Sequence, residues 1–577
     1  MQSEDAPHVL TLGKLVKLAV EILGEEKDYF KLTIIYGVGI SLLSLATPIS
    51  VQMLINTVAN TGLATPLIVL SLTLFALLLF SGYLNALRIH LMEIFGRRFY
   101  ARLVSEITLR ALYARNPFFS DQSKSDLFNR YFDIIIVQKN IPVLLVGGFT
   151  LILQAAVGFA LVSLYHPLFF VFNLVFIMII WAVWTIWGGA GVQTAAELSH
   201  KKHEAADWIE GLGASNGFFK SERHIAHALT NADAVTHNYI EAHRAHFRQY
   251  FSQTVSFFVI YAVASALLLG LGGWLVIQAQ LSVGQLVAAE LVLSAAFFGV
   301  SQLGTYLNYF YELCGSIDEL SLFFGVEQDE PTSSNRLQIH DPSLRFANVE
   351  GQARGRHARL DFDIKGGSVV MATAANHGVQ RLMTDILKRH EDPRSGYVAF
   401  GGSDIRSMEL HALRQEIIVI DRTTILETTI REFLHLNAAD PSPECILNAL
   451  KTVGLEPVVA DLEDGLDTKV ARTGWPLSVT ETMQLKLAAA ILAQPRVLIL
   501  NQLYDLMAEN CIKNAINALR QDPSLTVIYF SNRRQDLGFD SFLYMGRERQ
   551  CVFDAYEEYS TMAHSSTPRL ISEVKGI

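Results

Sequence analysis

The sequence predicts an α-helical membrane domain of six transmembrane helices, followed by a soluble α/β domain. The main observation is the spacing of positive charge, because three long stretches of the N-terminal part contain no Lys or Arg. They lie between Lys31 and Arg88, between Lys139 and Lys201, and between Arg248 and Arg336. Each stretch is long enough for two apolar crossings of about 20 residues joined by a short turn. The C-terminal part instead contains short apolar strands between polar segments, such as Val497–Leu500.

The six crossings follow from these stretches in chain order. They are expected at residues 32–57, 65–87, 141–164, 167–190, 254–278 and 284–310. Pro48 lies within the first crossing, which a membrane helix tolerates. Ahead of it, residues 10–22 repeat apolar side chains at helical spacing beside Lys14 and Lys17. This pattern fits either a helix lying along the membrane face or a solvated lead-in helix.

The charged connections predict the orientation in the membrane. The two long connections, residues 88–139 and 201–248, are rich in Lys and Arg, whereas the short ones near Gly62, His166 and Gln280 have none. By the positive-inside rule, the long connections and both termini are cytoplasmic. We therefore expect a multi-pass protein of an inner or plasma membrane. The N-terminus has no basic segment ahead of a short apolar run, so a cleaved signal peptide is not expected.

Composition argues against two other classes of protein. The formal net charge of −10 disfavours a nucleic-acid binder, which needs clustered Lys and Arg to neutralise phosphates. The four cysteines have no metal-ligand spacing and are expected to be reduced, cytosolic and structural. They are Cys314, Cys445, Cys511 and Cys551.

Two sets of polar residues in the membrane domain are candidate sites. Glu290 is a carboxylate well inside an expected crossing, and such residues often mark a substrate or proton site. The alternative places Glu290 near the outer end of the last helix, where it is wetted or hydrogen-bonded.

Histidines form three pairs at i and i+3 in the second long connection, a spacing that places two imidazoles on one helix face. The pairs are His200 and His203, His224 and His227, and His243 and His246, with His237 between them. We expect solvated helix faces and no metal here, and a pH-sensitive face is a further option.

The segment from Gly474 to Leu506 carries a resemblance to a known family. Leu477, Ser478, Val479, Thr480 and Glu481 open an expected helix, and a later apolar strand ends in Asn501 and Gln502. This resembles the signature-to-Walker-B segment of ABC (ATP-binding cassette) exporters, which have Leu-Ser-Gly-Gly-Gln and Asp-Glu at these places. The resemblance covers nearly the whole chain and implies an exporter-type membrane domain fused to a cassette domain.

The other cassette motifs are recognisable in order but have lost their functional side chains. The phosphate loop, Gly-x-x-x-x-Gly-Lys-Ser/Thr, corresponds to residues 373–380, where Thr373, Gly378, Val379 and Gln380 occupy the motif positions. The glutamine of the next loop is replaced by Asp421 or Arg422, and the switch histidine by Asn532.

These replacements remove the lysine, the Mg²⁺ ligands and the base that phosphoryl transfer requires. ATP and Mg²⁺ are therefore not expected to bind in the usual way, and no other cofactor is expected.

The expected domains are an N-terminal interfacial helix at 1–30, a transmembrane domain at 31–326, a linker at 327–343 and a degenerate cassette at 344–577. The resemblance implies a dimer in the membrane that acts in or alongside export. It would be either the inert half of a heterodimeric exporter or a homodimer that binds a substrate or membrane partner and uses the cassette for docking. The alternatives are a weakly active ATP-driven exporter with unusual nucleotide chemistry and a regulatory membrane scaffold.

Overall fold

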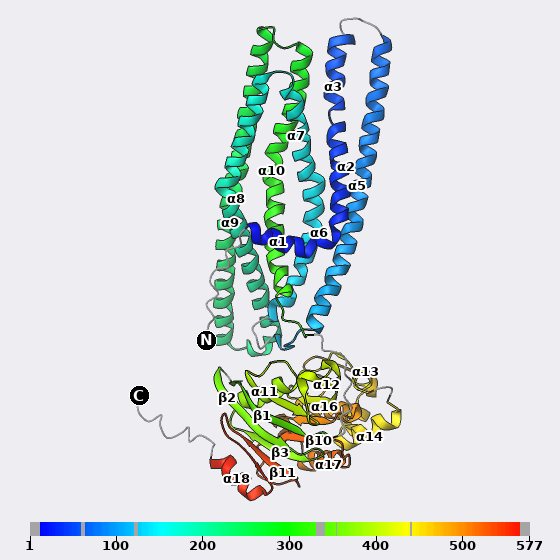
Figure 1. Cartoon of the computed structure of the whole chain (residues 1–577), viewed down its shortest axis with the longest axis vertical. Coiled ribbons are helices and arrows are strands. Elements are labelled where there is room, and N and C mark those ends of the chain that lie inside the picture. The colour runs from blue at the N-terminus through cyan, green and yellow to red at the C-terminus, as the bar shows by residue number, and fades with distance from the viewer. Residues whose placement is uncertain are drawn as a thin grey trace, which may run out of the picture. The chain divides into compact units, whose positions relative to one another are not determined.

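The structure is a computed structural model that describes residues 12–58, 64–119, 125–330, 341–353, 355–438 and 441–565 (Figure 1). The chain divides into two compact units, Met1–Gln328 and Asp329–Ile577. The division falls inside the expected linker, most of which lies outside the described residues. We call the first the membrane unit and the second the cassette unit, and each is described by itself.

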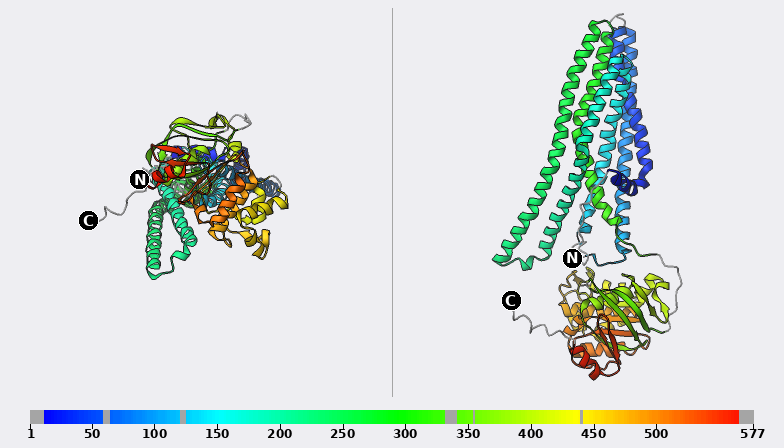
Figure 2. Two further views of the ribbon diagram at one scale, coloured as in Figure 1. Left: turned by 90° about the horizontal axis from the view of Figure 1, so that it is seen from below. Right: turned by 60° about the vertical axis from the view of Figure 1, so that its left-hand side comes forward.

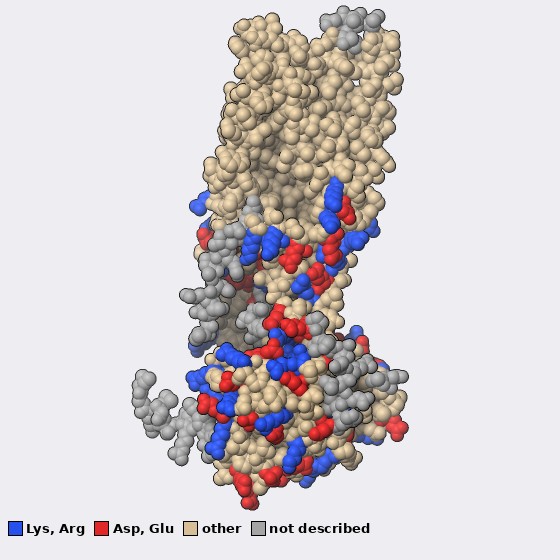
Figure 3. All heavy atoms as spheres, in the orientation of Figure 1, with Lys and Arg blue, Asp and Glu red and all other residues tan. Residues whose placement is uncertain are grey.

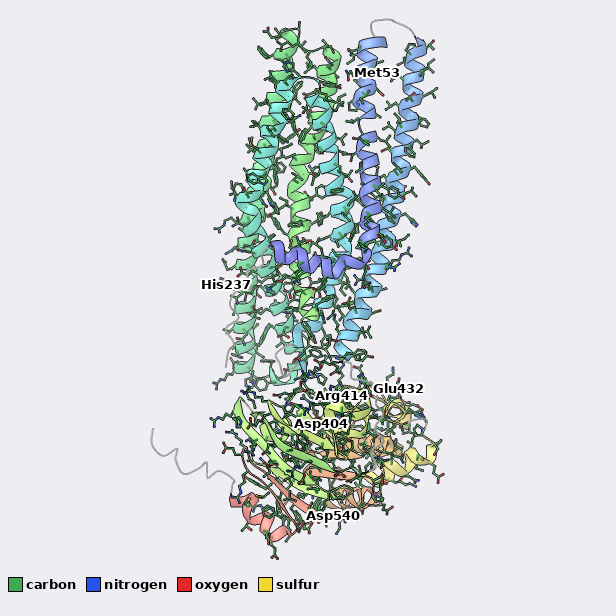
Figure 4. All side chains as sticks on the ribbon, viewed as in Figure 1. Met53, His237, Asp404, Arg414, Glu432 and Asp540 are labelled. Carbon is green, nitrogen blue, oxygen red and sulfur yellow. The ribbon has the colours of Figure 1, made fainter. Side chains whose placement is uncertain are left out.

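The membrane unit is built from long helices, six of which, in the described residues, are long and apolar enough to cross a membrane. The first crossing joins α2 (Lys27–Leu43), α3 (Ala46–Met53) and a π-helical turn at Leu54–Val58, with Met53 near its C-terminal end (Figure 4). The third joins α6 (Phe132–Val143), a second π-helical turn and α7 (Phe149–Ser163). The others are single helices, α5 (Ala64–Leu112), α8 (Pro167–Ala214), α9 (Glu222–Ile277) and α10 (Val283–Phe324). The prediction of six crossings is confirmed.

Four of these helices continue well past the apolar stretch, because their charged segments keep helical character. Figure 3 shows that the face of the membrane unit in view has no charged residue over the upper part of its helices and many over the lower part. The pair α8 and α9 run side by side for most of their length (Figures 1 and 2). The helices approach closely where one of them has a glycine. A Cβ atom at Gly299 would lie 2.8 Å from Leu151, so close packing of α10 on α7 requires the missing side chain.

Helix α1 (Leu12–Leu23) is amphipathic and packs Leu15 and Ile22 into one cluster with α6, the C-terminal half of α5 and the end of α10. A short 3-10 turn follows, in which the buried Glu26 accepts hydrogen bonds from Arg102 at 2.7 and 2.8 Å. This ion pair fixes the end of α1 against α5. Leu10, the first residue of the expected helix, lies outside the described residues.

The prediction of solvated histidine faces is wrong for two of the six paired histidines. His203 is 4% exposed, and its Nε2 lies 2.6 Å from a carboxylate oxygen of the fully buried Asp133. His246 is also buried and lies 3.1 Å from the Thr194 hydroxyl. Neighbouring helices provide these partners, a carboxylate for His203 and a hydroxyl for His246, and helix periodicity does not reveal them.

A third histidine of the same set, His200, remains about half exposed and lies between two carboxylates, 2.8 Å from Glu319 and 3.2 Å from Asp318. His237 does face outward from α9 (Figure 4). Among the described residues, no cluster of three or more His, Cys, Asp and Glu side chains has the geometry to hold a metal ion.

The cassette unit contains a six-stranded sheet in the order β12-β11-β3-β10-β9-β6 and a four-stranded antiparallel sheet in the order β2-β1-β4-β5. The strands of the first sheet are β3 (Val369–Ala374), β6 (Ile417–Ile420), β9 (Val497–Leu500), β10 (Thr526–Phe530), β11 (Ser541–Met545) and β12 (Gln550–Phe553). Those of the second are β1 (Leu344–Ala353), β2 (Arg356–Ile364), β4 (Ser395–Phe400) and β5 (Ser403–Asp404). A two-stranded ribbon adds β7 (Thr428–Thr429) and β8 (Lys469–Val470).

The central strands β3, β6, β9 and β10 are parallel. Strands β9 and β10 are fully buried and β3 and β6 are buried in part, as near-continuous runs of Val, Ile and Leu predict. Their carboxyl ends therefore meet at one edge of the sheet, where the candidate motif residues lie. The helices of this unit are α11 (His377–Leu387), α12 (Leu410–Glu416), α13 (Ile430–Leu436), α14 (Pro443–Val453), α15 (Glu456–Asp461), α16 (Val479–Ala493), α17 (Glu509–Leu519) and α18 (Tyr556–Ser565). Six membrane helices followed by an α/β unit are the predicted fold class.

Candidate functional site

The turn between β3 and α11 stands where a phosphate loop would lie. Strand β3 includes Thr373 and Ala374, the first two residues of the expected phosphate loop, which pair with Tyr544 and Met545 of β11. Only Ala375 and Asn376 then separate the strand from α11. The side chain of Asn376 caps the helix by accepting the Val379 N–H at 3.2 Å. N–H groups at a helix N-terminus bind phosphate when they are left open, and here a side chain of the same chain occupies one of them.

The lysine position of the motif is part of the hydrophobic core. Val379 is 0% exposed and belongs to the cluster between the two sheets and α11. The next residue, Gln380, is also buried, and its Oε1 accepts a hydrogen bond of 3.0 Å from Nε2 of Gln502. The two positions that would hold and use Mg²⁺ in the family are therefore bonded to each other. Arg381, one residue further on, lies 3.2 Å from Asp385 on the same helix.

Asn501, at the Walker B position, uses both ends of its amide. Its Nδ2 donates to the Asp421 carbonyl at 2.8 Å, and its Oδ1 accepts the Leu503 N–H at 3.0 Å. The second bond caps a 3-10 turn, Gln502–Leu506, that ends the strand β9. An aspartate could not donate the first of these bonds. Asn501 therefore fits a structural joint between strands β6 and β9 better than a metal ligand.

Asp505 is a site residue that motif comparison did not identify. Its Oδ1 accepts from the hydroxyls of Tyr529 at 2.5 Å and Ser531 at 2.7 Å, and its Oδ2 accepts the Asn532 N–H at 2.8 Å. Arg533 adds an ion pair at 3.6 Å. Asn532, at the switch position, is thus held through its backbone, and Asp505 fixes the carboxyl end of β10.

Thr373 connects this region to the C-terminal helix α18. Its hydroxyl donates to the Ser531 carbonyl at 3.1 Å and also contacts the Tyr559 hydroxyl. Tyr559 is buried against Phe542 and Phe553, and this burial raises the pKa of its phenol to about 12. The phenol therefore remains a neutral hydrogen-bonding group at physiological pH.

The signature positions form a helix cap. Ser478 accepts the Glu481 N–H at 3.3 Å, while the Glu481 carboxylate accepts the Ser478 N–H at 2.7 Å, which is a reciprocal capping box for α16. Val479 is the first residue of the helix and is half exposed. The Glu481 carboxylate satisfies the Ser478 N–H, and its negative charge at this helix N-terminus repels an approaching phosphate. Leu477 is buried, and Thr480 lies in the first turn.

Lys388 is partly buried at the C-terminal end of α11. Its Nζ donates to the Arg414 carbonyl at 2.8 Å and to the Ile417 carbonyl at 2.6 Å, so it ties the end of α11 to α12 and β6. Burial, reinforced by the positive charge of Arg414, lowers the pKa of this amine to about 8. Because Nζ of Lys388 is bonded to two backbone carbonyls, we assign this lysine a structural role.

The motif residues described above bond to groups of the cassette unit itself. The structure brings Gln380 together with Gln502, and Thr373 together with the switch segment, whereas the signature residues bond to one another. No described residue of the motif positions is a lysine or a carboxylate directed at the turn after β3. The motif positions therefore lack the lysine, the Mg²⁺ ligands and the base that phosphoryl transfer uses.

Glu290 of the membrane unit lies on α10. One of its oxygens accepts a hydrogen bond of 2.9 Å from Ser294, one turn along the same helix, and the other is buried without a partner among the described residues. The hydrogen bond to Ser294 fits a structural carboxylate, whereas the unpartnered buried oxygen fits a substrate or proton site. The role of Glu290 stays a prediction.

Comparison with known proteins adds the following. The family model described as the ABC transporter transmembrane region matches residues 31–207. The ABC multidrug transporter mdr2 of Aspergillus fumigatus is 26% identical over 53% of this chain and 40% of its own length. The Leukotoxin export ATP-binding protein LtxB of Aggregatibacter actinomycetemcomitans is 24% identical over 45% of this chain and 38% of its own length. The chain thus spans less than half the length of these relatives.

A solved structure is similar over almost the whole chain. It is described as a bacterial Atm1-family ABC exporter with ATP bound, and it matches with a TM-score of 0.78 at 18% identity, covering 94% of this chain and 98% of that one. The chain therefore has the fold of an ABC exporter, with a six-helix membrane unit followed by a cassette unit.

Proposed function

We propose that this chain is a dimeric, ABC-exporter-type membrane protein whose cassette does not itself hydrolyse ATP. It acts in or alongside export, either as the inert half of a heterodimer or as a homodimer that binds a substrate or membrane partner. The chain is then a member of the ABC exporter family with a pseudo-cassette, and both termini are cytoplasmic because the positive charges gather in the long connections.

One observation carries the proposal: the polar groups at the motif positions are bonded to each other. Gln380 bonds to Gln502 at 3.0 Å, and Asn501 bonds to the Asp421 carbonyl at 2.8 Å. Buried amides that are already paired resist displacement, since breaking the pair leaves an unsatisfied group that costs about 1–3 kcal/mol. A nucleotide would have to break both contacts and would find no lysine or Mg²⁺ ligand in return.

A second candidate is a weakly active ATP-driven exporter. It is favoured by the comparisons, because a relative is named as an export ATP-binding protein and the similar solved structure is described with ATP bound. A regulatory membrane scaffold is the third reading, and its mark would be co-purification with another membrane complex.

The oligomeric state of the purified chain distinguishes the heterodimer form from the homodimer form. The full chain, expressed alone and reconstituted in nanodiscs, is expected to be poorly monodisperse if it is half of a heterodimer. A well-behaved homodimer would remove the heterodimer form and leave the docking form. Phosphate release from ATP, measured on the same sample, separates either form from an active exporter.

A further inference from the structure

We propose that a cavity in the membrane unit binds an amphiphile with one anionic head, a carboxylate or a phosphate, through Thr150 and the buried cation Arg88. This inference rests on the proposed transport-related function for its meaning, but binding itself involves no nucleotide. It would hold or fail independently of whether the cassette hydrolyses ATP.

Arg88 is a charge without a countercharge inside the helix bundle. It is 3% exposed, and its guanidinium donates to two neutral groups, the Thr150 hydroxyl and the Asn85 amide oxygen, the latter at 2.8 Å. Its Nε has no hydrogen-bond partner, and no carboxylate among the described residues pairs with it. An arginine stays protonated in such a place. A buried charge without a countercharge is costly, which makes Arg88 a candidate functional residue.

Thr150 lies between Arg88 and the cavity. It lines a cavity of about 390 Å³ and accepts the hydrogen bond from Arg88, so its own O–H hydrogen is left to donate. Thr33 and Thr254 instead donate to the carbonyl one turn earlier, whereas Thr150 makes no such bond in the described part of the chain. A hydroxyl polarised by a guanidinium is a strengthened donor for an anion.

The rest of the cavity adds donors and apolar surface. Gln154 and Gln302 contribute side-chain amides from α7 and α10, and Gln154 has no hydrogen-bond partner among the described residues. Leu45, Pro48 and Phe298 line the remainder. Donors around one point and apolar side chains beside it fit a charged head with an alkyl chain.

A second cavity extends the site along the bundle. It measures about 540 Å³ and shares Val146, Gly147 and Tyr306 with the first. It is mostly apolar, but Arg97 and Lys139 lie on its wall. Arg97 is nine residues beyond Arg88 on α5, which is about 13 Å along the helix. Arg97 is paired with Glu93 at 2.7 Å, so it is the already compensated cation of the two.

The test uses the full chain in neutral detergent with dodecyl phosphate as the probe and dodecanoate, dodecyltrimethylammonium and the neutral detergent alone for comparison. Affinities are read by native mass spectrometry and by thermal shift. Dodecyl phosphate or dodecanoate is expected to bind and stabilise the protein. The ratio of their two affinities shows which head group is preferred. Dodecyltrimethylammonium is expected not to bind.

The variants locate the binding. Arg88→Met and Thr150→Val are each expected to weaken the anionic probe by about tenfold or more, since each removes a hydrogen bond to a charged group. Arg88→Lys should retain part of the affinity. The control Arg244→Gln changes an exposed arginine of α9, paired with Glu241 at 2.6 Å, and should leave the affinity unchanged. Arg88→Met should also raise the melting temperature of the ligand-free protein, which checks that it folds. Equal binding of the cationic probe, or unchanged binding in both Arg88→Met and Thr150→Val, would overturn the proposal.

Discussion

Replacing Val379 by Lys is expected to weaken the cassette without creating ATP turnover. The Val379 side chain is fully buried between the sheets and α11, so the substitution would place an ammonium in the core near the positive end of the helix dipole. Losing the apolar contacts and burying an unpaired charge together cost about 3–5 kcal/mol. Turnover stays absent because Gln502 cannot act as a base and is bonded to Gln380.

The measurement is hydrogen exchange by mass spectrometry on the full chain, read at the core strands β3 and β10. A loss of 3 kcal/mol or more corresponds to exchange about a hundredfold faster at these amides. The matched control is Val552→Lys, which makes the same change on β12 at the edge of the sheet, where Val552 is 45% exposed. The control should change exchange little.

The reasoning would be refuted if Val379→Lys exchanged as slowly as Val552→Lys. That outcome would mean that the side chain at 379 reaches solvent and that the turn after β3 opens as a working phosphate loop does. ATP hydrolysis by the single variant would refute the assignment of the motif positions as well.

Three further predictions concern the cassette. Ser478→Ala removes the capping hydroxyl of α16 and should cost about 1 kcal/mol, seen as faster exchange in the first turn of that helix, whereas Glu481→Gln keeps a capping box and should behave like the wild type. Tyr559→Phe should lower the melting temperature slightly, by losing one hydrogen bond worth about 1 kcal/mol to Thr373 while keeping the aromatic packing; no change would show that the contact is unimportant. The pKa of Lys388 is lowered to about 8, so above that pH this amine binds fewer protons in the folded than in the unfolded state. The stability of the wild type relative to Lys388→Met should therefore rise by about 2 kcal/mol from pH 8 to pH 10. A falling difference between the two unfolding midpoints would contradict this sign.

The membrane unit was largely predictable, because charge is excluded from lipid and the gaps between charges measure the crossings directly. Arg88 shows the limit of that logic. It ends a gap in the charge pattern, so the expected crossing stopped just before it, yet α5 continues through it and buries it. Periodicity and charge spacing do not tell which residue of another helix contacts a given side chain, such as Thr150 of α7 against Arg88 of α5.

The cassette shows the same division between local and long-range information. The strands and the order of the motifs follow from local patterns, and the altered residues at the motif positions are visible in the sequence. Their hydrogen bonds are not, since Gln380 and Gln502 are 122 residues apart and Thr373 and Tyr559 are 186 apart. Asp505 was missed for the same reason: only the return of β10 next to β9 brings Tyr529 and Ser531 to its carboxylate.

The most direct test of the proposed function is equilibrium binding of radiolabelled ATP to the full chain in nanodiscs, with and without Mg²⁺, alongside phosphate release. The account predicts no saturable binding at millimolar ATP, no effect of Mg²⁺ and no phosphate release above that of empty nanodiscs. Saturable, Mg²⁺-dependent binding with steady phosphate release would contradict it and establish an ATP-driven transporter.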